Sequence, residues 1–136
     1  MMKTYTYLTL FIFLILSDVV FSQCPDTEQK SSSDTIVAFI THSAWSSQRN
    51  DMGLGTATTN DIRKLSNSSD QQVCQELNEE SVALFENYDI FYYKVKNRYI
   101  TVSILKQPEE PDVFSVGLSY IDIYDSLVNR LQGYSF

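Results

Sequence analysis

The most regular pattern in the chain is an alternation of apolar and polar residues between positions 89 and 104, which predicts a β-hairpin. If Lys96 and Asn97 form a two-residue turn, the strands on either side come into register at once. The pairs are Val95 with Arg98, Tyr93 with Ile100, Phe91 with Val102 and Asp89 with Ile104. One face then holds the apolar side chains of Phe91, Tyr93, Val95, Ile100, Val102 and Ile104. Because a slip of one residue would turn an apolar set away from the core, the agreement of the two strands supports this register.

The opposite face of the hairpin has the wetter composition of an antiparallel sheet with one side in solvent. It carries Ile90, Tyr92, Lys94, Tyr99, Thr101 and Ser103. Exposed tyrosines offer rigid contact area together with a hydroxyl group, and protein interfaces favour both. We therefore predict that Tyr92, Tyr99, Thr101 and Lys94 form a partner-binding surface. The alternative is that these tyrosines only pack against their cross-strand neighbours.

A helical stripe predicts one helix from about residue 69 to 86. The stripe consists of Val73, Cys74, Leu77, Leu84 and Phe85. Two overlapping capping boxes suit its start, Ser68 with Gln71 and Ser69 with Gln72. Asp70 adds a negative charge where the helix dipole favours one.

Shorter apolar segments predict the remaining strands. Residues 36–40 are continuously apolar, and we interpret them as a strand. Residues 56–65 are rich in threonine and suit an edge strand. Residues 113–124 predict a further strand, in which a change of phase near Tyr120 suggests a bulge.

The last segment of the chain predicts a turn followed by a closing strand. Residues 125–129 turn the chain, and residues 130–136 form the strand. Asp125 and Arg130 have opposite charges and are expected to pair across the mouth of the turn.

In order, these elements are a strand, a helix and four strands joined by short turns. They define an α+β domain in which one helix packs on a four- to five-stranded antiparallel sheet. The order resembles the cystatin-like arrangement over roughly residues 55 to 136. The Gln-x-Val-x-Gly loop by which cystatins inhibit cysteine proteases has no counterpart, since the hairpin tip reads Lys94, Val95, Lys96, Asn97, Arg98. Protease inhibition is therefore not implied, and a likeness of fold alone argues no function.

The N-terminus has the order of a secretory signal peptide over residues 1–22. Lys3 precedes an apolar run at residues 8–16, and small or polar residues follow as far as Ser22. The run is too short for a membrane span, which needs roughly 20 apolar residues. Val20 and Ser22 suit cleavage before Gln23. We therefore expect a secreted or periplasmic protein with no transmembrane span in the mature chain.

Composition places one small domain after this leader. Residues 23–34 are polar and rich in serine, and we interpret them as a flexible N-terminal segment. Residues 35–136 are then a single small α+β domain. The net charge is −7 at pH 7, and it is unchanged by loss of the leader, which removes one cation and one anion. Such a surface repels nucleic acid and anionic lipid, so neither is expected as a partner.

Cys24 and Cys74 are the only two cysteines, and an even pair in an exported chain predicts one disulfide. One alternative is a buried thiol at Cys74 with a free Cys24. Another is lipidation of Cys24, although Gln23 before it is larger than the residue usual at that position. Two cysteines without a neighbouring histidine do not make a zinc site.

No group of residues has the pattern of a catalytic, metal or cofactor site. His42 is the sole histidine, but in a strand the adjacent Thr41 and Ser43 point to the face opposite it. The paired carboxylates are neighbours in sequence, which cannot face each other across a substrate. The pairs are Glu79 with Glu80 and Glu109 with Glu110, and Asp112 follows the second pair.

These observations favour a non-catalytic extracytoplasmic module that binds another protein or an envelope component through its tyrosine-bearing sheet face. A small hydrolase or inhibitor that uses His42 or the acidic groups is the first alternative. A lipid-anchored accessory protein, held through Cys24, is the second.

Overall fold

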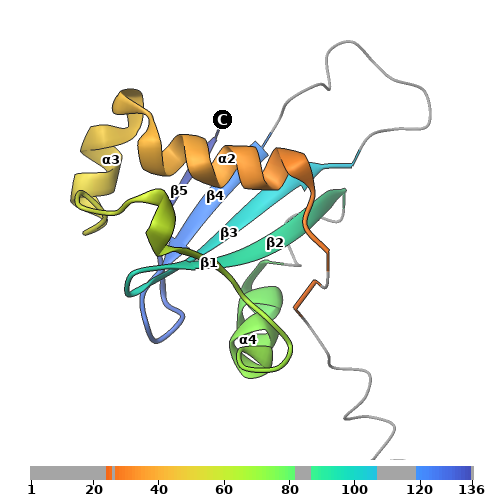
Figure 1. Cartoon of the computed structure of the whole chain (residues 1–136). Coiled ribbons are helices and arrows are strands. Elements are labelled where there is room, and N and C mark those ends of the chain that lie inside the picture. The colour runs from red at the N-terminus through yellow and green to blue at the C-terminus, as the bar shows by residue number, and fades with distance from the viewer. Residues whose placement is uncertain (1–23, 26, 82–86, 107–118, 136) are drawn as a thin grey trace, which may run out of the picture.

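The computed structural model describes residues 24–25, 27–81, 87–106 and 119–135. Its centre is a five-stranded antiparallel sheet in the order β1-β2-β3-β4-β5 (Figure 1). The strands are β1 (Ile62–Lys64), β2 (Tyr88–Val95), β3 (Arg98–Leu105), β4 (Ser119–Tyr124) and β5 (Arg130–Ser135). The α+β class and the antiparallel sheet are therefore confirmed. Of the edge strand predicted at 56–65, only Ile62–Lys64 is extended, as β1 at one edge of the sheet, and Thr59–Asp61 is a 3-10 helix.

The β2–β3 hairpin has the predicted register. Val95 pairs with Arg98, and the pairing continues without a slip to Tyr88 and Leu105. Lys96, the first turn residue, has a φ of 53°, in the left-handed region that tight hairpin turns require. The apolar set of the hairpin lies in one core, as the alternation predicted.

The prediction of a strand at residues 36–40 is wrong, because these residues belong to helix α2 (Lys30–Thr41). Five consecutive apolar residues fit the period of a strand and that of a helix equally well. Over the longer segment, the buried positions recur every three or four residues, which is the period of a helix. The buried residues are Ser32, Ile36, Phe39 and Ile40, which share one helical face. The helix also takes residues 30–34 out of the segment interpreted as a flexible tail. Short helical segments follow it, η1 (Ser43–Trp45), α3 (Ser46–Asp51) and η2 (Thr59–Asp61).

The predicted second helix is α4 (Gln71–Ser81), and residues 82–86 of that prediction lie outside the described part of the chain. Its first turn is arranged differently from the capping boxes expected. The hydroxyls of Ser68 and Ser69 each lie 3.0 Å from the Ser66 hydroxyl. The Asp70 carbonyl accepts the Cys74 N–H at 2.9 Å, which is the first i→i+4 bond of the helix. Asp70 therefore stands where the cap residue belongs.

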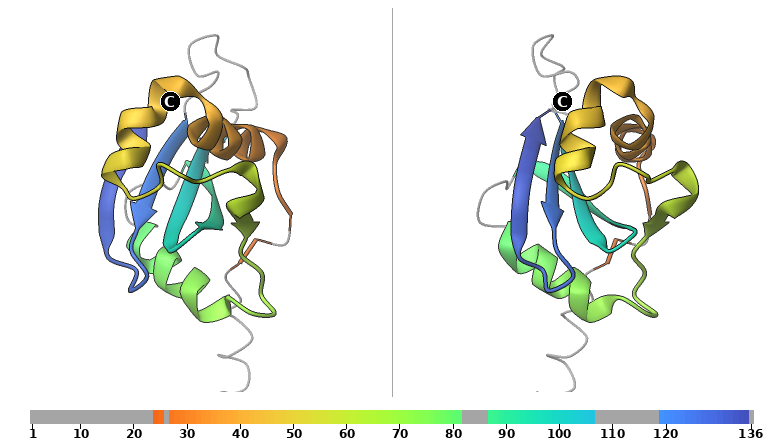
Figure 2. Two further views of the ribbon diagram at one scale, coloured as in Figure 1. Left: turned by 60° about the vertical axis from the view of Figure 1, so that its left-hand side comes forward. Right: turned by 90° about the vertical axis from the view of Figure 1, so that its left-hand side faces the viewer.

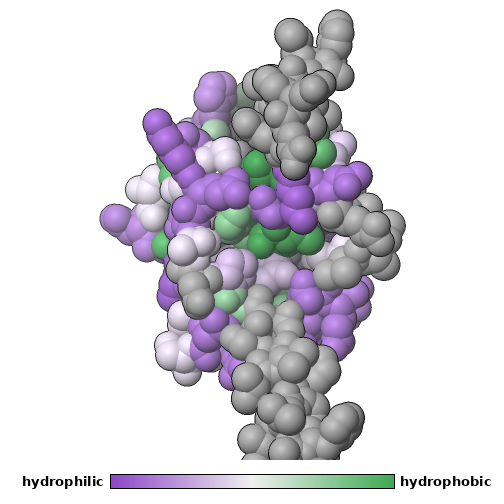
Figure 3. All heavy atoms as spheres, turned by 90° about the vertical axis from the view of Figure 1, so that its right-hand side faces the viewer, coloured by the Kyte–Doolittle hydropathy of each residue, from purple (hydrophilic) through white to green (hydrophobic). Residues whose placement is uncertain are grey.

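The helices lie on both sides of the sheet, with α2 and α3 on one side and α4 on the other (Figure 2). The core under α2 contains Ile36, Phe39, Ile40, Leu54, Phe91, Tyr93, Val95, Ile100, Val102, Ile121 and Ile123. The core under α4 contains Cys24, Leu65, Cys74, Leu77, Tyr92 and Tyr124. On the surface seen in Figure 3, hydrophilic side chains surround a central hydrophobic band. Both faces of the sheet are therefore at least partly covered, which the one-helix expectation did not include.

Strands β4 and β5 form the second hairpin, and residues 113–118 of the predicted long strand lie outside the described ranges. The irregularity in pairing falls at Ile123 and Tyr124 instead of near Tyr120. The turn at 125–129 is confirmed by a 2.9 Å bond from the Asp125 N–H to the Asn129 carbonyl. The expected pair of Asp125 with Arg130 is wrong. Arg130 pairs with Asp122 at 2.9 Å, while the Asp125 carboxylate accepts bonds from within the turn.

Candidate functional site

The sheet face predicted to bind a partner is largely buried. Tyr92 is 4% exposed and Thr101 is 0% exposed, whereas Lys94 and Tyr99 are half-buried. The Lys94 ammonium lies 5.4 Å from the centre of the Tyr99 ring. The expectation that Tyr92 and Thr101 are accessible is therefore wrong. The physical reason is that the apolar stripe of α4, with Cys74 and Leu77, packs on this face of the sheet.

Tyr92 has a structural environment in this core. Its hydroxyl donates a 3.0 Å hydrogen bond to Asn78 Oδ1 on α4. Burial raises the pKa of Tyr92 to about 12. The phenol is therefore neutral over the ordinary pH range, and it joins β2 to α4.

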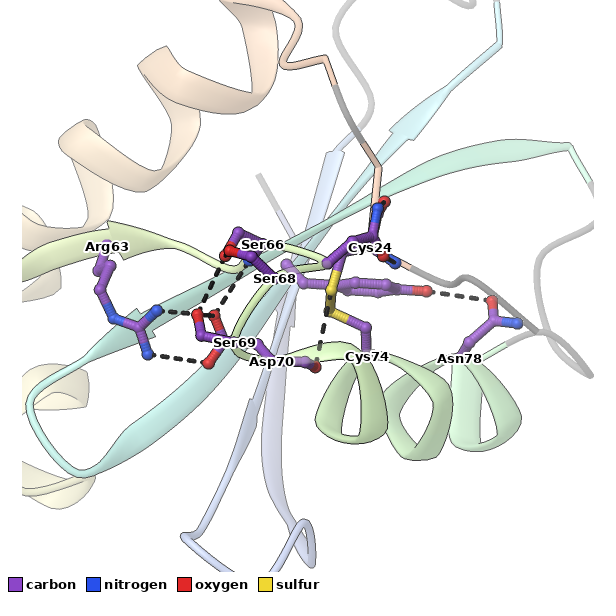
Figure 4. Close-up of a disulfide and its surroundings, with 10 residues drawn as sticks. Cys24, Arg63, Ser66, Ser68, Ser69, Asp70, Cys74 and Asn78 are labelled. Atoms are coloured by element: carbon purple, nitrogen blue, oxygen red, sulfur yellow. Dashed lines mark hydrogen bonds and ion pairs between the residues drawn. A yellow bond between two sulfur atoms is a disulfide. The ribbon is translucent and has the colours of Figure 1, made fainter. Parts of the chain in front are cut away.

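The predicted disulfide between Cys24 and Cys74 is present (Figure 4). It ties the N-terminal segment to α4, and the Asn67 side chain clamps the backbone beside it. Asn67 Nδ2 donates to the Cys24 carbonyl at 2.8 Å, and the Cys24 N–H donates to Asn67 Oδ1 at 3.0 Å. In this arrangement Cys24 has no free thiol for a lipid.

An ion pair lies close to this disulfide, at the start of α4 (Figure 4). Arg63 donates to both oxygens of Asp70, at 2.7 and 3.1 Å. The same carboxylate accepts the Ser66 N–H at 3.0 Å and the Ser69 hydroxyl at 3.1 Å. The hydrogen bonds from Arg63 lower the pKa of Asp70 to about 2. All of these partners lie within seven residues of Asp70 in the sequence, so the cluster stabilises the start of α4. We do not assign it a ligand.

A pocket of about 290 Å³ lies between the end of α4 and the last two strands. It is the strongest candidate for a binding site in the part of the chain that the structure describes. Its lining residues are Glu80, Ser81, Tyr120, Asp122, Tyr124, Arg130, Gly133, Tyr134 and Ser135. Protein ligand pockets start at about 300 Å³, so this volume suits one side chain or a small molecule better than a large ligand.

The charged pair in the pocket depends on the strand geometry. Arg130 Nε and Nη2 both donate to Asp122 Oδ1, at 3.1 and 2.9 Å. Asp122 faces Gly133 across β4 and β5, and the register shift lies at Tyr124, the residue that pairs with Arg130. A bulge re-aims side chains, and here Arg130 lies over Gly133 toward Asp122. A Cβ atom at position 133 would clash with Arg130 Nη2 and with Asp122 Oδ1.

Three tyrosines line the pocket, and two of them, Tyr120 and Tyr124, lie on β4. Tyr124 is almost fully buried, and burial raises its pKa, so it remains a neutral phenol. The ring of Tyr120 meets the ring of Tyr88 edge to face, with 5.5 Å between centroids. This contact orients one wall of the pocket.

The pocket residues were missed by sequence reasoning, although a signal for them exists. Ile121 and Ile123 alternate with polar or aromatic residues along β4, and both lie in the core under α2. The other phase of that strand is Tyr120, Asp122 and Tyr124, which therefore share the face opposite the α2 core. The contribution of Arg130 and Gly133 could not be read in the same way, because the bulge breaks the alternation.

The other chemical candidates do not form a site. His42 precedes η1 and its Nδ1 accepts the Ala44 N–H at 3.1 Å, which is a capping role. Glu79 and Glu80 are exposed neighbours at the end of α4, and only Glu80 reaches the pocket. Glu109, Glu110 and Asp112 lie outside the described residues. Within the described ranges, no group of three or more His, Cys, Asp or Glu side chains could hold a metal ion.

Helices in the described ranges are all too short or too polar to cross a membrane. No model of a known protein family matches the chain, and no curated protein and no solved structure shows significant similarity to it. The fold and the site therefore define a class only, a small disulfide-bonded α+β domain with a pocket at the β4–β5 end of its sheet.

Proposed function

We propose that this chain is a non-catalytic module that works outside the cytoplasm and binds another protein through the β4–β5 end of its sheet. The observation that carries the proposal is the pocket, which interrupts the cover that α4 provides over this face. Interfaces favour tyrosine and arginine, and both line the pocket. The binding face thus differs from the one that the sequence predicted, and it moves from β2–β3 to the neighbouring strands of the same sheet.

The extracytoplasmic part of the proposal has two supports. The disulfide between Cys24 and Cys74 requires an oxidising compartment to persist. The leader pattern of residues 1–22 supplies a route to such a compartment, with cleavage near Ser22 and a mature chain from Gln23. Both point to a secreted or periplasmic protein.

The open edge of the sheet adds a second element to the binding face. β5 is the last strand in the sheet order, and each of its residues is at least partly exposed. Edge strands present unpaired backbone groups that another chain can bind. A partner segment on β5 would lie directly beside the pocket.

Site-specific photo-crosslinking in the native host tests this function. A photoreactive residue at Leu131, which is 40% exposed on β5, is compared with one at Val37, which is 38% exposed on α2. The two positions match in exposure but lie on different parts of the molecule. We expect one discrete adduct from position 131, competed away by added wild-type mature protein, and none from position 37. Equal adducts from both positions, or no adduct from position 131, would reject the proposed face.

A further inference from the structure

The charges in the β4–β5 pocket indicate the chemistry of what enters it. Arg130 donates from both Nε and Nη2 to Asp122 Oδ1, so the positive charge of Arg130 and the negative charge of Asp122 largely neutralise each other. Glu80 is exposed at the rim, and among the described residues no ion pair to it is seen. The lining therefore carries two carboxylates against one guanidinium. The chain around it has a net charge of −7, which adds to the negative potential.

The aromatic side chains of the pocket also favour a cation. Tyr120 and Tyr124 line the pocket, and the face of a phenol ring attracts cations through its quadrupole. Ser81 and Ser135 add polar groups at the lining. A flexible apolar stem with a cationic head fits such a mixture better than an anion does.

From this arrangement we infer that the pocket takes a basic side chain, lysine or arginine, from a partner protein. The inference rests on the proposed function and deepens it, because it names the chemistry of the contacting segment. The volume of about 290 Å³ limits the occupant to about one side chain. In this inference Glu80 supplies the charge that meets the cation, since Asp122 is held by Arg130, and Tyr120 and Tyr124 lie beside its stem.

A titration followed by NMR tests the inference on the mature, disulfide-bonded chain. The probe is N-acetyl-lysine methylamide, and the comparison compounds are the norleucine and glutamate analogues. We expect saturable amide shifts in β4 and β5, at Tyr120, Asp122 and Gly133, with the lysine probe alone. Stronger shifts with the glutamate analogue would make this an anion site and overturn the inference. Equal shifts with the norleucine analogue, or no saturable shift with any probe, would overturn it too.

The role of the charge is isolated by a pair of neighbouring variants. Glu80→Gln removes the carboxylate at the rim of the pocket, and we expect it to weaken lysine-probe binding by about two- to fivefold, as for a partly exposed ion pair. Glu79→Gln changes the net charge equally, but Glu79 does not line the pocket. It should therefore leave the affinity unchanged. An equal effect of both variants would show that only the overall charge matters and would reject the site.

Failure here is distinguishable from failure of the proposed function. If adducts form at Leu131 but no lysine probe binds, the face binds protein and the pocket chemistry is wrong. If the lysine probe binds but no adduct forms at Leu131, the pocket is a cation site and the protein-binding function is wrong.

Discussion

At the scale of single residues, Asp70 holds together the segment that precedes α4. Its carboxylate accepts four hydrogen bonds, two from Arg63, one from the Ser66 N–H and one from the Ser69 hydroxyl. Its carbonyl receives the first bond of the helix, from Cys74. Because the Asp70 side chain is only 9% exposed, solvent replaces little of this network. The residue therefore couples β1, the serine turn and the helix through one charge.

The substitution Asp70→Asn should destabilise the fold by about 1 to 2 kcal/mol at neutral pH, because the charge-assisted bonds from Arg63 are lost. The pKa of the carboxyl is lower in the folded chain, about 2 against 3.8 for the ordinary group. Its contribution is therefore complete above 3.8 and disappears as the pH falls toward 2. The measurement is urea unfolding of both proteins across this range, and the difference between them should vanish at the acidic end.

The neighbouring turn offers a matched control for Asp70. Asp125 also has a lowered pKa, caused first by the backbone N–H of Asn129, but among the described residues its carboxylate forms no ion pair. Asp125→Asn should cost less than Asp70→Asn. A loss for Asp70→Asn that persists unchanged at acidic pH would mean that the ionised carboxylate is not the source of the stability.

At the scale of the elements, the β4–β5 hairpin shows how a bulge and a glycine build a pocket. The pairing shift beside Tyr124 places Arg130 on the same side of the sheet as Asp122. Gly133, which faces Asp122, leaves the space in which the ion pair lies. A side chain at this position would occupy the space of the pair. The pocket is therefore a property of two strands together, and no single residue of them accounts for it.

The substitution Gly133→Ala should displace the Arg130 head group and break its bonds to Asp122. Because Arg130 is long and half-exposed, the head group can move away, and we expect a loss of stability below about 1 kcal/mol. The measurement is a double-mutant cycle with Arg130→Ala, followed by urea unfolding. If the ion pair causes the loss, Gly133→Ala should cost nothing in the Arg130→Ala background. An undiminished cost there would place the conflict with the Asp122 carboxylate or the backbone.

At the scale of the whole molecule, the disulfide joins the N-terminal segment to a helix on the far side of the sheet from α2. Cys24 and Cys74 are 50 residues apart in sequence, so the bridge closes a loop that includes α2, α3 and β1. Such a loop restricts the unfolded chain strongly. The bridge also positions the polypeptide just before α2, whose Ser32 hydroxyl meets the Tyr93 hydroxyl at 3.1 Å. Both sides of the sheet are therefore linked by one covalent bond.

Reduction of the disulfide should lower the free energy of unfolding by about 4 kcal/mol in the loop-entropy treatment, less any structure that persists in the reduced unfolded chain. The measurement is urea unfolding with and without reductant, together with the intact mass, which should rise by two hydrogens on reduction. The variant that carries both Cys24→Ala and Cys74→Ala should resemble the reduced protein and no longer respond to reductant. An unfolding midpoint that reductant does not move would show that the bridge is absent or contributes nothing.

Predictions that rest on short-range patterns in the sequence were mostly correct, whereas those that depend on packing between elements were not. The hairpin register around Lys96 and Asn97 and the cysteine pair were correct. The edge strand and the helix α4 were correct in place and type, but only Ile62–Lys64 of the strand predicted at 56–65 is extended. The helix at Lys30–Thr41 was missed, because its central five residues fit two periods. The candidate site moved from Tyr92 and Tyr99 to β4 and β5, because α4 covers the first of these positions.

The hairpin and the disulfide could be predicted because alternation, turn residues and cysteine number act over short separations or by simple pairing. Which sheet face is open could not be predicted, because it depends on tertiary packing. Burial of Tyr92 and Thr101 depends on where α4 lies, and the pocket depends on a bulge that sets Arg130 over Gly133. The burial and the pocket both depend on contacts between different elements of the fold. The alternation along a strand does not show whether its second face is covered by a helix or exposed to water.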